Sequence, residues 1–352
     1  MPPGNGSSTA CKQDSEDYQT IKLLDGGFAS QLSCHVRNQI DGDVLWSARF
    51  LSTDPEAVIR THLDFLIAGS NIIETNTYQA SIGGFKEHLN LTEEESYALI
   101  KEAVYLAKSA LERFKKEYIP VADYAKFNND RPLIVGSVGP YGASLHDASE
   151  YSGSYAKTTP VQTMRDWHRP RIAALVEAGV DMLALETIPC KAEAEMLVQL
   201  IKEFPSVKAW LAFSCGQDGK STAYGENFQQ TAKKCYEMNP QQLVAVGANC
   251  LAPRLVESLF TGINKGRENR PIPLIVYPNS GESYNVEQGE YSRWIDREKC
   301  EPVETYIHKW LDLGVKYIGG CCRTYAADVT RIGNEVRKWQ FMQQERQING
   351  VN

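Results

Sequence analysis

Short apolar runs alternate with longer amphipathic segments along most of this chain, and the alternation constrains its fold more than any other feature. Repeated β-α units of this kind are typical of a parallel sheet covered by helices. Eight apolar runs can be counted: Ile21–Asp25, Asn71–Thr77, Leu133–Val138, Asp181–Glu186, Val207–Ser214, Leu243–Asn249, Pro273–Pro278 and Lys316–Cys321. Eight parallel strands with helices between them predict an α/β fold of the (β/α)8 TIM barrel type.

The domain organisation follows from the absence of an internal linker. The 352 residues suit one large barrel, so we expect a single domain. Residues 1–17 are polar and rich in Gly, Ser and Pro, which predicts a disordered N-terminal tail. The barrel is expected over residues 18–340 and a polar C-terminal tail over residues 341–352, while residues 118–131 and 284–302 have the character of insertions.

Three helix ends share one pattern. Gly69, Gly179 and Gly314 each follow an amphipathic segment and precede an apolar run, as expected of left-handed caps that release a helix into a strand. The helix before Gly69 is expected to begin with a capping box, in which Thr53 caps an amide and Glu56 reaches back.

Composition narrows the class of partner. The net charge is −7 and no basic stripe is present, so neither nucleic acid nor an anionic membrane surface is an expected partner. No signal sequence is recognisable, and no run approaches the roughly 20 apolar residues of a membrane span. We therefore expect a cytoplasmic protein that acts on a small molecule. Because cytosolic thiols are normally reduced, clustered cysteines among the nine indicate metal binding or catalysis.

Polar and metal-binding residues crowd the carboxyl ends of the apolar runs. In a barrel these ends share one face, and catalytic groups gather there. They hold Asp25-Gly26-Gly27, Glu74-Thr-Asn76, Gly136-Ser137, Glu186-Thr187, Ser214-Cys215, Asn249-Cys250, Tyr277-Pro-Asn279-Ser280 and Gly319-Gly320-Cys321-Cys322. The sequence therefore predicts a site at the C-terminal face of the barrel.

Three of these cysteines form the strongest candidate. Cys250 directly follows the sixth run, and Cys321 and Cys322 close the eighth, so barrel closure would bring the three together. Three protein ligands with an open fourth position are typical of a catalytic Zn²⁺ site. Gly319 and Gly320 would allow the close approach that two adjacent ligands need. Singly, each cysteine is more often a small buried hydrophobe, and we expect that role for the other six.

The motifs resemble those of the homocysteine S-methyltransferase family. The resemblance covers nearly the whole chain after Tyr18 and is carried by Asp25-Gly-Gly-Phe, Trp46, Ala68-Gly-Ser-Asn-Ile-Ile-Glu-Thr-Asn-Thr-Tyr, Glu186-Thr-Ile-Pro, Gly247-Ala-Asn-Cys250, Tyr277-Pro-Asn-Ser-Gly-Glu282 and Gly319-Gly-Cys-Cys-Arg-Thr324. It implies homocysteine as substrate and Cys250, Cys321 and Cys322 as the zinc ligands. It also implies a homocysteine site lined by Asp25, Gly26, Glu186, Thr187, Asn249 and Asn279.

Within the family, the resemblance favours a sulfonium methyl donor. Cys-Cys-Arg-Thr and the segment from Tyr277 to Glu282 are similar to the members that use such donors, and Gln79 stands where betaine-using members have tyrosine. Among sulfonium donors, we expect S-methylmethionine first and S-adenosylmethionine second. Trp46 could face the cationic donor through its ring. Neither folate nor cobalamin is expected, and the chain is expected to be a monomer or a weak homo-oligomer.

Other interpretations stay open. The donor could be betaine, or the cysteines could form a closed, non-catalytic zinc-thiolate site with a fourth protein ligand. Asp25 and Glu186 could instead be caps or salt-bridge partners, and Asn249 and Asn279 could satisfy backbone groups at the barrel mouth. The segment from Ser214 to Ser221 nearly matches a phosphate loop but lacks its first glycine.

Overall fold

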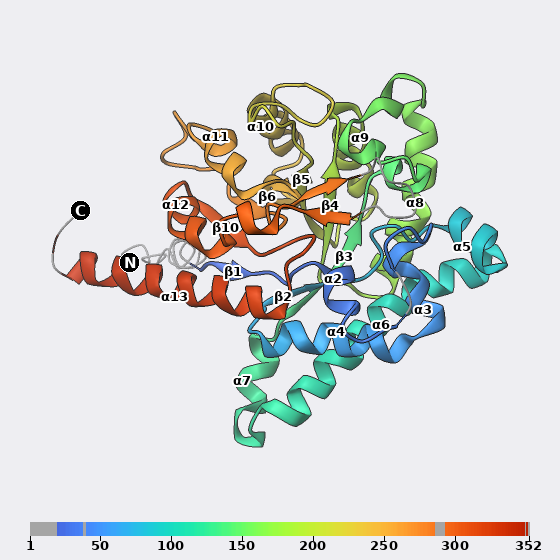
Figure 1. Cartoon of the computed structure of the whole chain (residues 1–352), viewed down its shortest axis with the longest axis horizontal. Helices are drawn as coiled ribbons and strands as arrows, with labels where there is room; N and C mark the ends of the chain where they lie inside the picture. Colours follow the sequence, from blue (N-terminus) through green and yellow to red (C-terminus); the bar gives the residue numbers. More distant parts are fainter. Residues whose placement is uncertain (1–19, 38–39, 286–292, 349, 351–352) are drawn as a thin grey trace, which may run out of the picture.

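A computed structural model describes residues 20–37, 40–285, 293–348 and 350 (Figure 1). Its main sheet has eight parallel strands in the spatial order β1-β10-β7-β6-β5-β4-β3-β2. The strands are β1 (Lys22–Leu23), β2 (Ile72–Glu74), β3 (Leu133–Val138), β4 (Met182–Ile188), β5 (Lys208–Phe213), β6 (Leu243–Asn249), β7 (Leu274–Tyr277) and β10 (Val315–Ile318). Every strand overlaps one of the eight apolar runs, so the predicted TIM barrel is confirmed.

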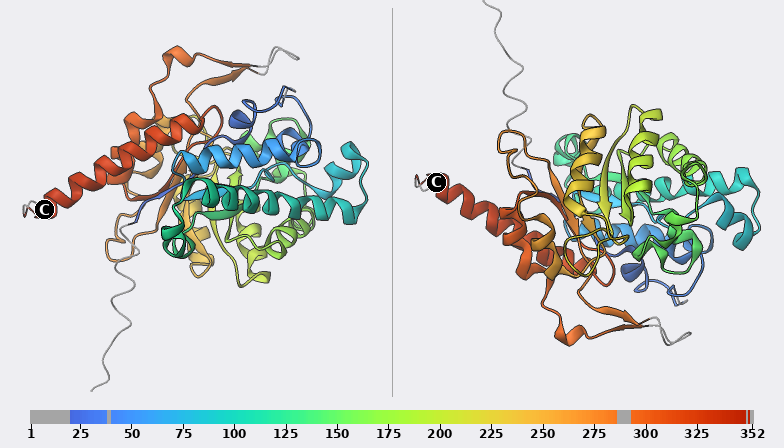
Figure 2. Two further views of the ribbon diagram at one scale, coloured as in Figure 1. Left: turned by 90° about the horizontal axis from the view of Figure 1, so that it is seen from below. Right: turned by 90° about the horizontal axis from the view of Figure 1, so that it is seen from above.

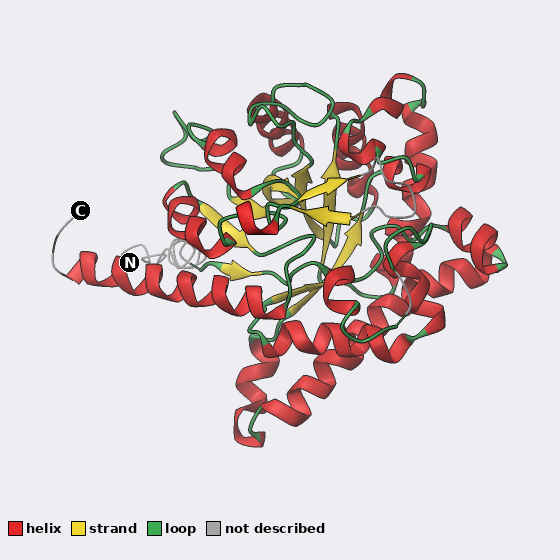
Figure 3. Ribbon diagram, viewed as in Figure 1, coloured by secondary structure: helices red, strands yellow, loops and turns green. Residues whose placement is uncertain are grey.

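Helices surround the strands on the outside of the barrel (Figure 3). They are α2 (Phe28–Leu32), α3 (Phe50–Thr53), α4 (Pro55–Ile67), α5 (Ile82–Leu89), α6 (Glu93–Tyr118), α7 (Tyr124–Asn129), α8 (Val161–Glu177), α9 (Lys191–Leu200), α10 (Phe228–Met238), α11 (Val256–Phe260), α12 (Ile307–Asp312) and α13 (Ala326–Ile348). Within the described residues, no helix is both long enough and apolar enough to span a membrane.

Two hydrophobic clusters hold the barrel together. The larger one fills the layer between helices and strands, as expected where each helix buries one apolar face on the sheet. The smaller one fills the barrel interior and includes Leu24, Val135, Trp210 and Tyr277. Trp210 Nε1 donates to the hydroxyl of Tyr277 at 2.9 Å, so the interior polar groups pair with each other beneath the mouth.

The barrel closes between β1 and β2 without a regular ladder among the described residues. The backbone N–H of Asn71 donates to Leu23 O at 2.7 Å, and the side-chain oxygen of Asn71 accepts from Leu23 N at 3.0 Å. Two residues after Leu23, the carboxylate of Asp25 accepts from the backbone N–H of Glu74 at 2.7 Å. Side chains thus complete the hydrogen bonding that a two-residue strand cannot.

The expected insertions contain local structure. Residues 118–131 hold α7, and the second insertion contributes the antiparallel pair β8 (Ser283–Asn285) and β9 (Arg293–Ile295). This pair projects from the barrel, as does the end of α13 (Figure 2). Helix α13 continues to Ile348, so most of the expected polar C-terminal tail is helical. The expected N-terminal tail, residues 1–17, lies outside the described residues.

Three of the predicted helix ends are found in the structure, whereas one predicted helix start differs. Gly69, Gly179 and Gly314 have φ values of 101°, 80° and 94°, which confirms the left-handed caps. The expected capping box at Thr53 is wrong. Asp54 is the N-cap of α4, and its side chain accepts from Ala57 N, because Thr53 belongs to α3 and its hydroxyl donates to Arg49 O.

Candidate metal and substrate site

A cavity opens at the carboxyl ends of the strands, on the face where the sequence predicted a site. It is lined by Asp25, Gly26, Gly27, Phe28, Ala29, Ser30, Trp46, Ser47, Glu74, Thr75, Asn76, Tyr78, Ser137, Tyr151, Glu186, Thr187, Cys250, Tyr277, Gly320, Cys321 and Cys322. The lining of the cavity has three parts: a group of thiols, a group of carboxyls and an aromatic wall.

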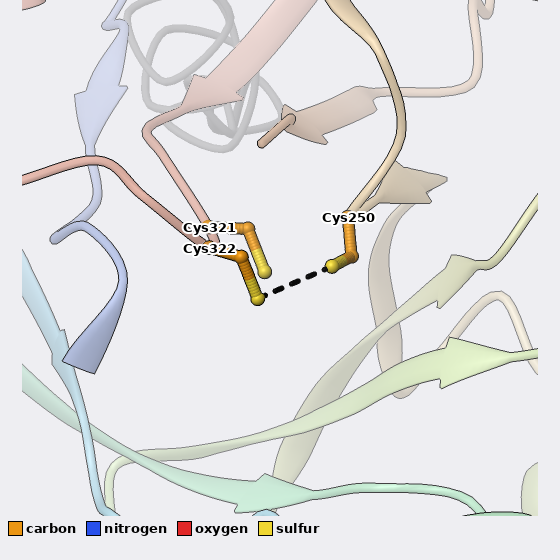
Figure 4. A group of neighbouring side chains, drawn as sticks. All are labelled: Cys250, Cys321 and Cys322. Atoms are coloured by element: carbon orange, nitrogen blue, oxygen red, sulfur yellow. Dashed lines mark hydrogen bonds between the residues drawn. The ribbon is translucent and has the colours of Figure 1, made fainter. Parts of the chain in front are cut away.

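The three predicted cysteines converge in this cavity (Figure 4). The sulfur atoms of Cys250, Cys321 and Cys322 all lie within 4.8 Å of one another, and those of Cys250 and Cys322 are 3.5 Å apart. Sulfurs bound 2.3 Å from a tetrahedral zinc would be separated by about 3.8 Å. Thiol hydrogen bonds from Cys321 and Cys322 lower the pKa of Cys250. The donor set therefore fits zinc in both spacing and chemistry.

Backbone contacts explain how cysteines from distant strands meet. Cys250 has a φ of 50°, so the chain turns sharply where β6 ends, and its N–H donates to Tyr277 O at 3.0 Å. Cys321 N donates to Pro278 O at 2.7 Å. The chain after β7 therefore lies between the two cysteine segments and fixes the distance between them.

The glycine pair before Cys321 allows close approach, as predicted. A Cβ at Gly319 would lie 2.6 Å from Leu24 Cβ and 2.7 Å from Asp25 O. At Gly320 it would lie 2.2 Å from Thr324 Oγ1. The end of β10 thereby packs against the end of β1, which brings the cysteines beside Asp25.

Three buried carboxyl groups form the second feature. The exposed fractions of Asp25, Glu74 and Glu186 are 3%, 9% and 7%. Burial raises the pKa of all three, that of Glu186 to about 7. The hydroxyl of Ser137 donates to Glu186. Carboxyls this close in a buried site are stabilised by a bound cation, and the ammonium group of an amino acid is one that would fit.

The predicted substrate residues divide into two groups. Asp25, Gly26, Trp46, Glu186 and Thr187 line the cavity, whereas Asn249 and Asn279 do not. Gly26 packs tightly, since an added Cβ would lie 2.9 Å from both Phe65 and Thr324 O.

Asn249 and Asn279 support backbone instead of lining the cavity. The side chain of Asn249 accepts from Thr187 N at 2.7 Å and donates to Thr187 Oγ1 at 2.8 Å. It holds Thr187 in a left-handed conformation, with a φ of 56°. Asn279 Oδ1 accepts from Gly281 N at 2.9 Å. Both asparagines therefore lie outside the lining of this cavity, and their part in the homocysteine site stays a prediction.

An aromatic wall is the third feature. The rings of Trp46 and Tyr78 meet edge to face at 5.8 Å, and the hydroxyl of Tyr151 lies 3.3 Å from Cys250 Sγ. Sequence reasoning assigned no role to Tyr78, Tyr151 or Glu74. The position of Glu74 at a strand end was a usable signal, but Tyr151 lies in a short 3₁₀ turn (Ser149–Tyr151) without a recognisable pattern.

The segment from Ser214 to Ser221, which nearly matches a phosphate loop, uses its backbone amides for internal hydrogen bonds. The carboxylate of Asp218 accepts from the backbone N–H groups of Lys220 and Ser221 and from the Ser221 hydroxyl. These amides are therefore not available to a phosphate. Five further cysteines, Cys34, Cys190, Cys215, Cys235 and Cys300, are free thiols outside the cavity, and Cys11 lies outside the described residues.

Comparisons with known proteins agree on one family. The model of the family described as homocysteine S-methyltransferase matches residues 22–336. A betaine-homocysteine S-methyltransferase of Drosophila melanogaster is 44% identical over 322 residues, covering 90% of this chain and 94% of that protein. Homocysteine S-methyltransferase 1 of Arabidopsis thaliana is 38% identical over 320 residues, covering 90% and 93%. The metallated crystal structure of the Escherichia coli homocysteine methyltransferase MmuM superposes with a TM-score of 0.75 at 34% identity, covering 92% of this chain and 99% of that one.

Proposed function

This chain belongs to the homocysteine S-methyltransferase family, and on that premise we propose that it uses a sulfonium donor and a zinc ion held by Cys250, Cys321 and Cys322. It is a methyltransferase, and the reaction of its family converts homocysteine to methionine. S-methylmethionine is the proposed donor, with S-adenosylmethionine second. The observation that carries the proposal is the convergence of three thiols beside three buried carboxyls in one cavity.

The cysteines would hold the metal and leave room for the substrate. Three protein ligands would leave room for a fourth, and a zinc ion held by these cysteines would lower the pKa of a substrate thiol that, free, is mostly protonated at neutral pH. The hydroxyl of Tyr151 lies 3.3 Å from Cys250 Sγ, and by donating to a Cys250 thiolate it would stabilise negative charge on that ligand.

The carboxyls would orient homocysteine. Its α-ammonium group would lie among Asp25, Glu74 and Glu186, where a positive charge offsets the cost of burying ionised carboxylates. Because the end of β1 and the end of β10 pack together at Gly319, the proposed ammonium site and the proposed metal site would be neighbours. One amino acid would then reach both with its two ends.

The transfer itself is a displacement at carbon. The homocysteine sulfur attacks the methyl carbon, the bond from that carbon to the donor sulfur breaks, and the electron pair stays on the donor sulfur. The positive donor becomes a neutral thioether, and the thiolate becomes methionine. Trp46 and Tyr78 present aromatic rings to this region, and such rings attract a sulfonium cation. What supports a sulfonium donor is this wall together with the sequence motifs.

Betaine is the alternative to a sulfonium donor, because a relative with 44% identity carries betaine in its name. Betaine presents its methyl groups on a quaternary nitrogen, which aromatic rings also attract. Gln79 supports a sulfonium donor less directly than the sequence suggested. Its amide does not line the cavity but donates to Val44 O and contacts His146 Nδ1, both at 3.0 Å.

The test combines zinc content with methionine formation from homocysteine, supplying S-methylmethionine, S-adenosylmethionine and betaine separately. We expect about one zinc per chain and activity with a sulfonium donor, both lost in Cys321→Ala. Cys34→Ala is the matched control, since Cys34 is exposed and does not line the cavity. Activity with betaine alone would replace the proposed sulfonium donor by betaine. Tight zinc binding without activity from any donor would instead indicate a closed, non-catalytic site.

A further inference from the structure

Two buried polar atoms in the cavity lack a hydrogen-bond partner among the described residues. They are the side-chain oxygen of Asn76 and the hydroxyl of Tyr78, and both residues line the cavity. Asn76 is only 2% exposed. Buried polar groups in native proteins are nearly always paired, so two unpaired atoms on residues that line one cavity indicate contact with a ligand.

Neighbouring residues do not satisfy these atoms. The Asn76 amide nitrogen donates to Ser47 O at 3.1 Å, which fixes the orientation of the side chain and leaves its oxygen free. Burial raises the pKa of the Tyr78 hydroxyl well above its usual value, an effect that nearby Thr187 only partly offsets, and no hydrogen bond of normal geometry reaches this hydroxyl from the described residues. The hydroxyl oxygen of Thr187 already accepts from Asn249.

Asn76 and Tyr78 lie nearer to the mouth of the barrel than the carboxyl group of Glu74. Glu74, Asn76 and Tyr78 alternate along the chain as it leaves β2, and all three line the cavity. Because β2 points toward the mouth, Asn76 and Tyr78 lie beyond Glu74 in that direction. Their contacts with Ser47 and Trp46 place them along the aromatic wall.

The Tyr78 segment is held rigidly from behind. Arg171 is 2% exposed, and its guanidinium donates to the carbonyls of Thr77 and Tyr78 at 3.1 and 2.9 Å. Gly139 lets the ring pack closely, since an added Cβ would lie 2.7 Å from Tyr78 Cδ2. A hydroxyl fixed in this way is preorganised to bind, because little side-chain freedom remains to be lost.

We propose that Asn76 and Tyr78 bind the amino-acid head group of the methyl donor and thereby determine which donor is used. The Asn76 oxygen accepts from the donor's ammonium group, and the Tyr78 hydroxyl donates to its carboxylate. This assignment rests on the proposed function. It distinguishes S-methylmethionine, which carries both groups, from betaine, whose nitrogen has no hydrogen to donate.

The test compares two sulfonium donors that differ at the head group. Dimethylsulfoniopropionate has the dimethylsulfonium and carboxylate groups of S-methylmethionine but no ammonium. In Asn76→Leu, kcat/KM for S-methylmethionine should fall about ten- to hundredfold, the effect of losing one hydrogen bond to a charged group, with dimethylsulfoniopropionate unaffected. In Tyr78→Phe, kcat/KM should fall for both donors, mainly through a rise in the KM for the donor.

Controls separate this assignment from a general defect. Tyr105→Phe, at an exposed position of α6, should match the wild type. Asn76→Asp keeps an acceptor oxygen and should retain the preference for S-methylmethionine. Zinc content, melting temperature and the KM for homocysteine should stay near wild-type values in Tyr78→Phe, which changes one oxygen atom.

Three outcomes would overturn the assignment: an unchanged donor preference in Asn76→Leu, loss of that preference in Asn76→Asp, or a rise in the homocysteine KM in place of the donor KM. Failure of the wild type to use any sulfonium donor is a different result. It would reject the proposed function itself, before any variant is compared.

Discussion

Asp25 accepts a hydrogen bond through Oδ2 from the backbone N–H of Glu74, at 2.7 Å, across the junction of β1 and β2. The same carboxyl lines the cavity. One side chain therefore helps to close the barrel and also contributes charge to the proposed ammonium site.

Substitutions of Asp25 should separate these two roles. Asp25→Asn keeps an acceptor oxygen for Glu74 N but removes the charge, so we expect a near wild-type melting temperature and a homocysteine KM raised about tenfold or more. Asp25→Ala leaves a buried N–H unpaired and should also lower the free energy of unfolding by about 1–3 kcal/mol. Thermal denaturation and steady-state kinetics measure both. Equal homocysteine KM values in Asp25→Asn and wild type would contradict a role in substrate binding.

Homocysteine binding should strengthen as pH rises through neutrality. Burial raises the pKa of Glu186 to about 7, so its carboxylate form, which attracts an ammonium group, predominates only above that pH. The KM for homocysteine should therefore fall as pH increases through about 7. Glu186→Gln should have a higher KM with a flatter pH profile, and a profile unchanged from wild type would count against Glu186.

The same pKa shift predicts how stability depends on pH without substrate. A carboxyl whose folded-state pKa is raised binds more protons in the folded than in the unfolded chain. The stabilisation is complete below about pH 4.5, the ordinary value for glutamate, and is lost as pH rises through about 7. Melting temperatures measured across this range should fall less steeply when homocysteine is bound.

His62 should make the protein less stable in acid. It is fully buried in α4 against Phe28, with ring centroids 4.9 Å apart, and neither ring nitrogen has a partner among the described residues. Burial lowers its pKa to about 3, so the ring stays neutral in the folded protein while it protonates in the unfolded chain. Stability is complete above about pH 6.5 and should fall by about 1.4 kcal/mol per pH unit as pH drops toward 3.

Denaturant unfolding at several pH values would measure this slope. Other groups also titrate in acid, so the informative quantity is the difference between His62→Leu and wild type. The variant removes a buried titratable ring and should lose that part of the slope. Parallel curves for the two proteins would show that His62 does not contribute.

Gly319→Ala should impair the metal site through the backbone. Its Cβ would lie 2.6 Å from Leu24 Cβ, so β1 and β10 must separate and the Cys321 segment must move. We expect reduced zinc content and a lower melting temperature. Gly83→Ala, where an added Cβ would meet nothing within 4 Å, is the control and should be neutral or slightly stabilising in α5. Normal zinc content in Gly319→Ala would mean that the strand ends tolerate separation.

The sequence predicted the barrel and its cysteines because both depend on local patterns. Apolar runs bounded by polar residues identify strands, and barrel geometry then places every strand end at one face. Cys250, Cys321 and Cys322 follow from that placement alone. Asp25 and Glu186 stand at strand ends too, which is why they also line the cavity.

The remaining differences depend on side-chain direction and on contacts between distant segments. Asn249 and Asn279 share strand ends with lining residues, but their amides pair with the backbone at Thr187 and Gly281. Such pairing requires knowledge of conformations that the sequence does not reveal, including the left-handed one at Thr187. Tyr151 approaches Cys250 from a loop 99 residues away in sequence, and no periodic pattern indicates that contact.

The close spacing of the three sulfur atoms has a consequence for metal exchange. The thiols of Cys250, Cys321 and Cys322 lie within 4.8 Å of one another, on backbone that hydrogen bonds to Tyr277 O and Pro278 O hold in place. Because these bonds belong to the barrel itself, we expect uptake of an ion to require proton release but little rearrangement of the backbone. A chelated sample should accordingly stay folded, and its capacity to take up metal should return quickly on adding zinc, at a rate governed by thiol deprotonation and by access through the mouth.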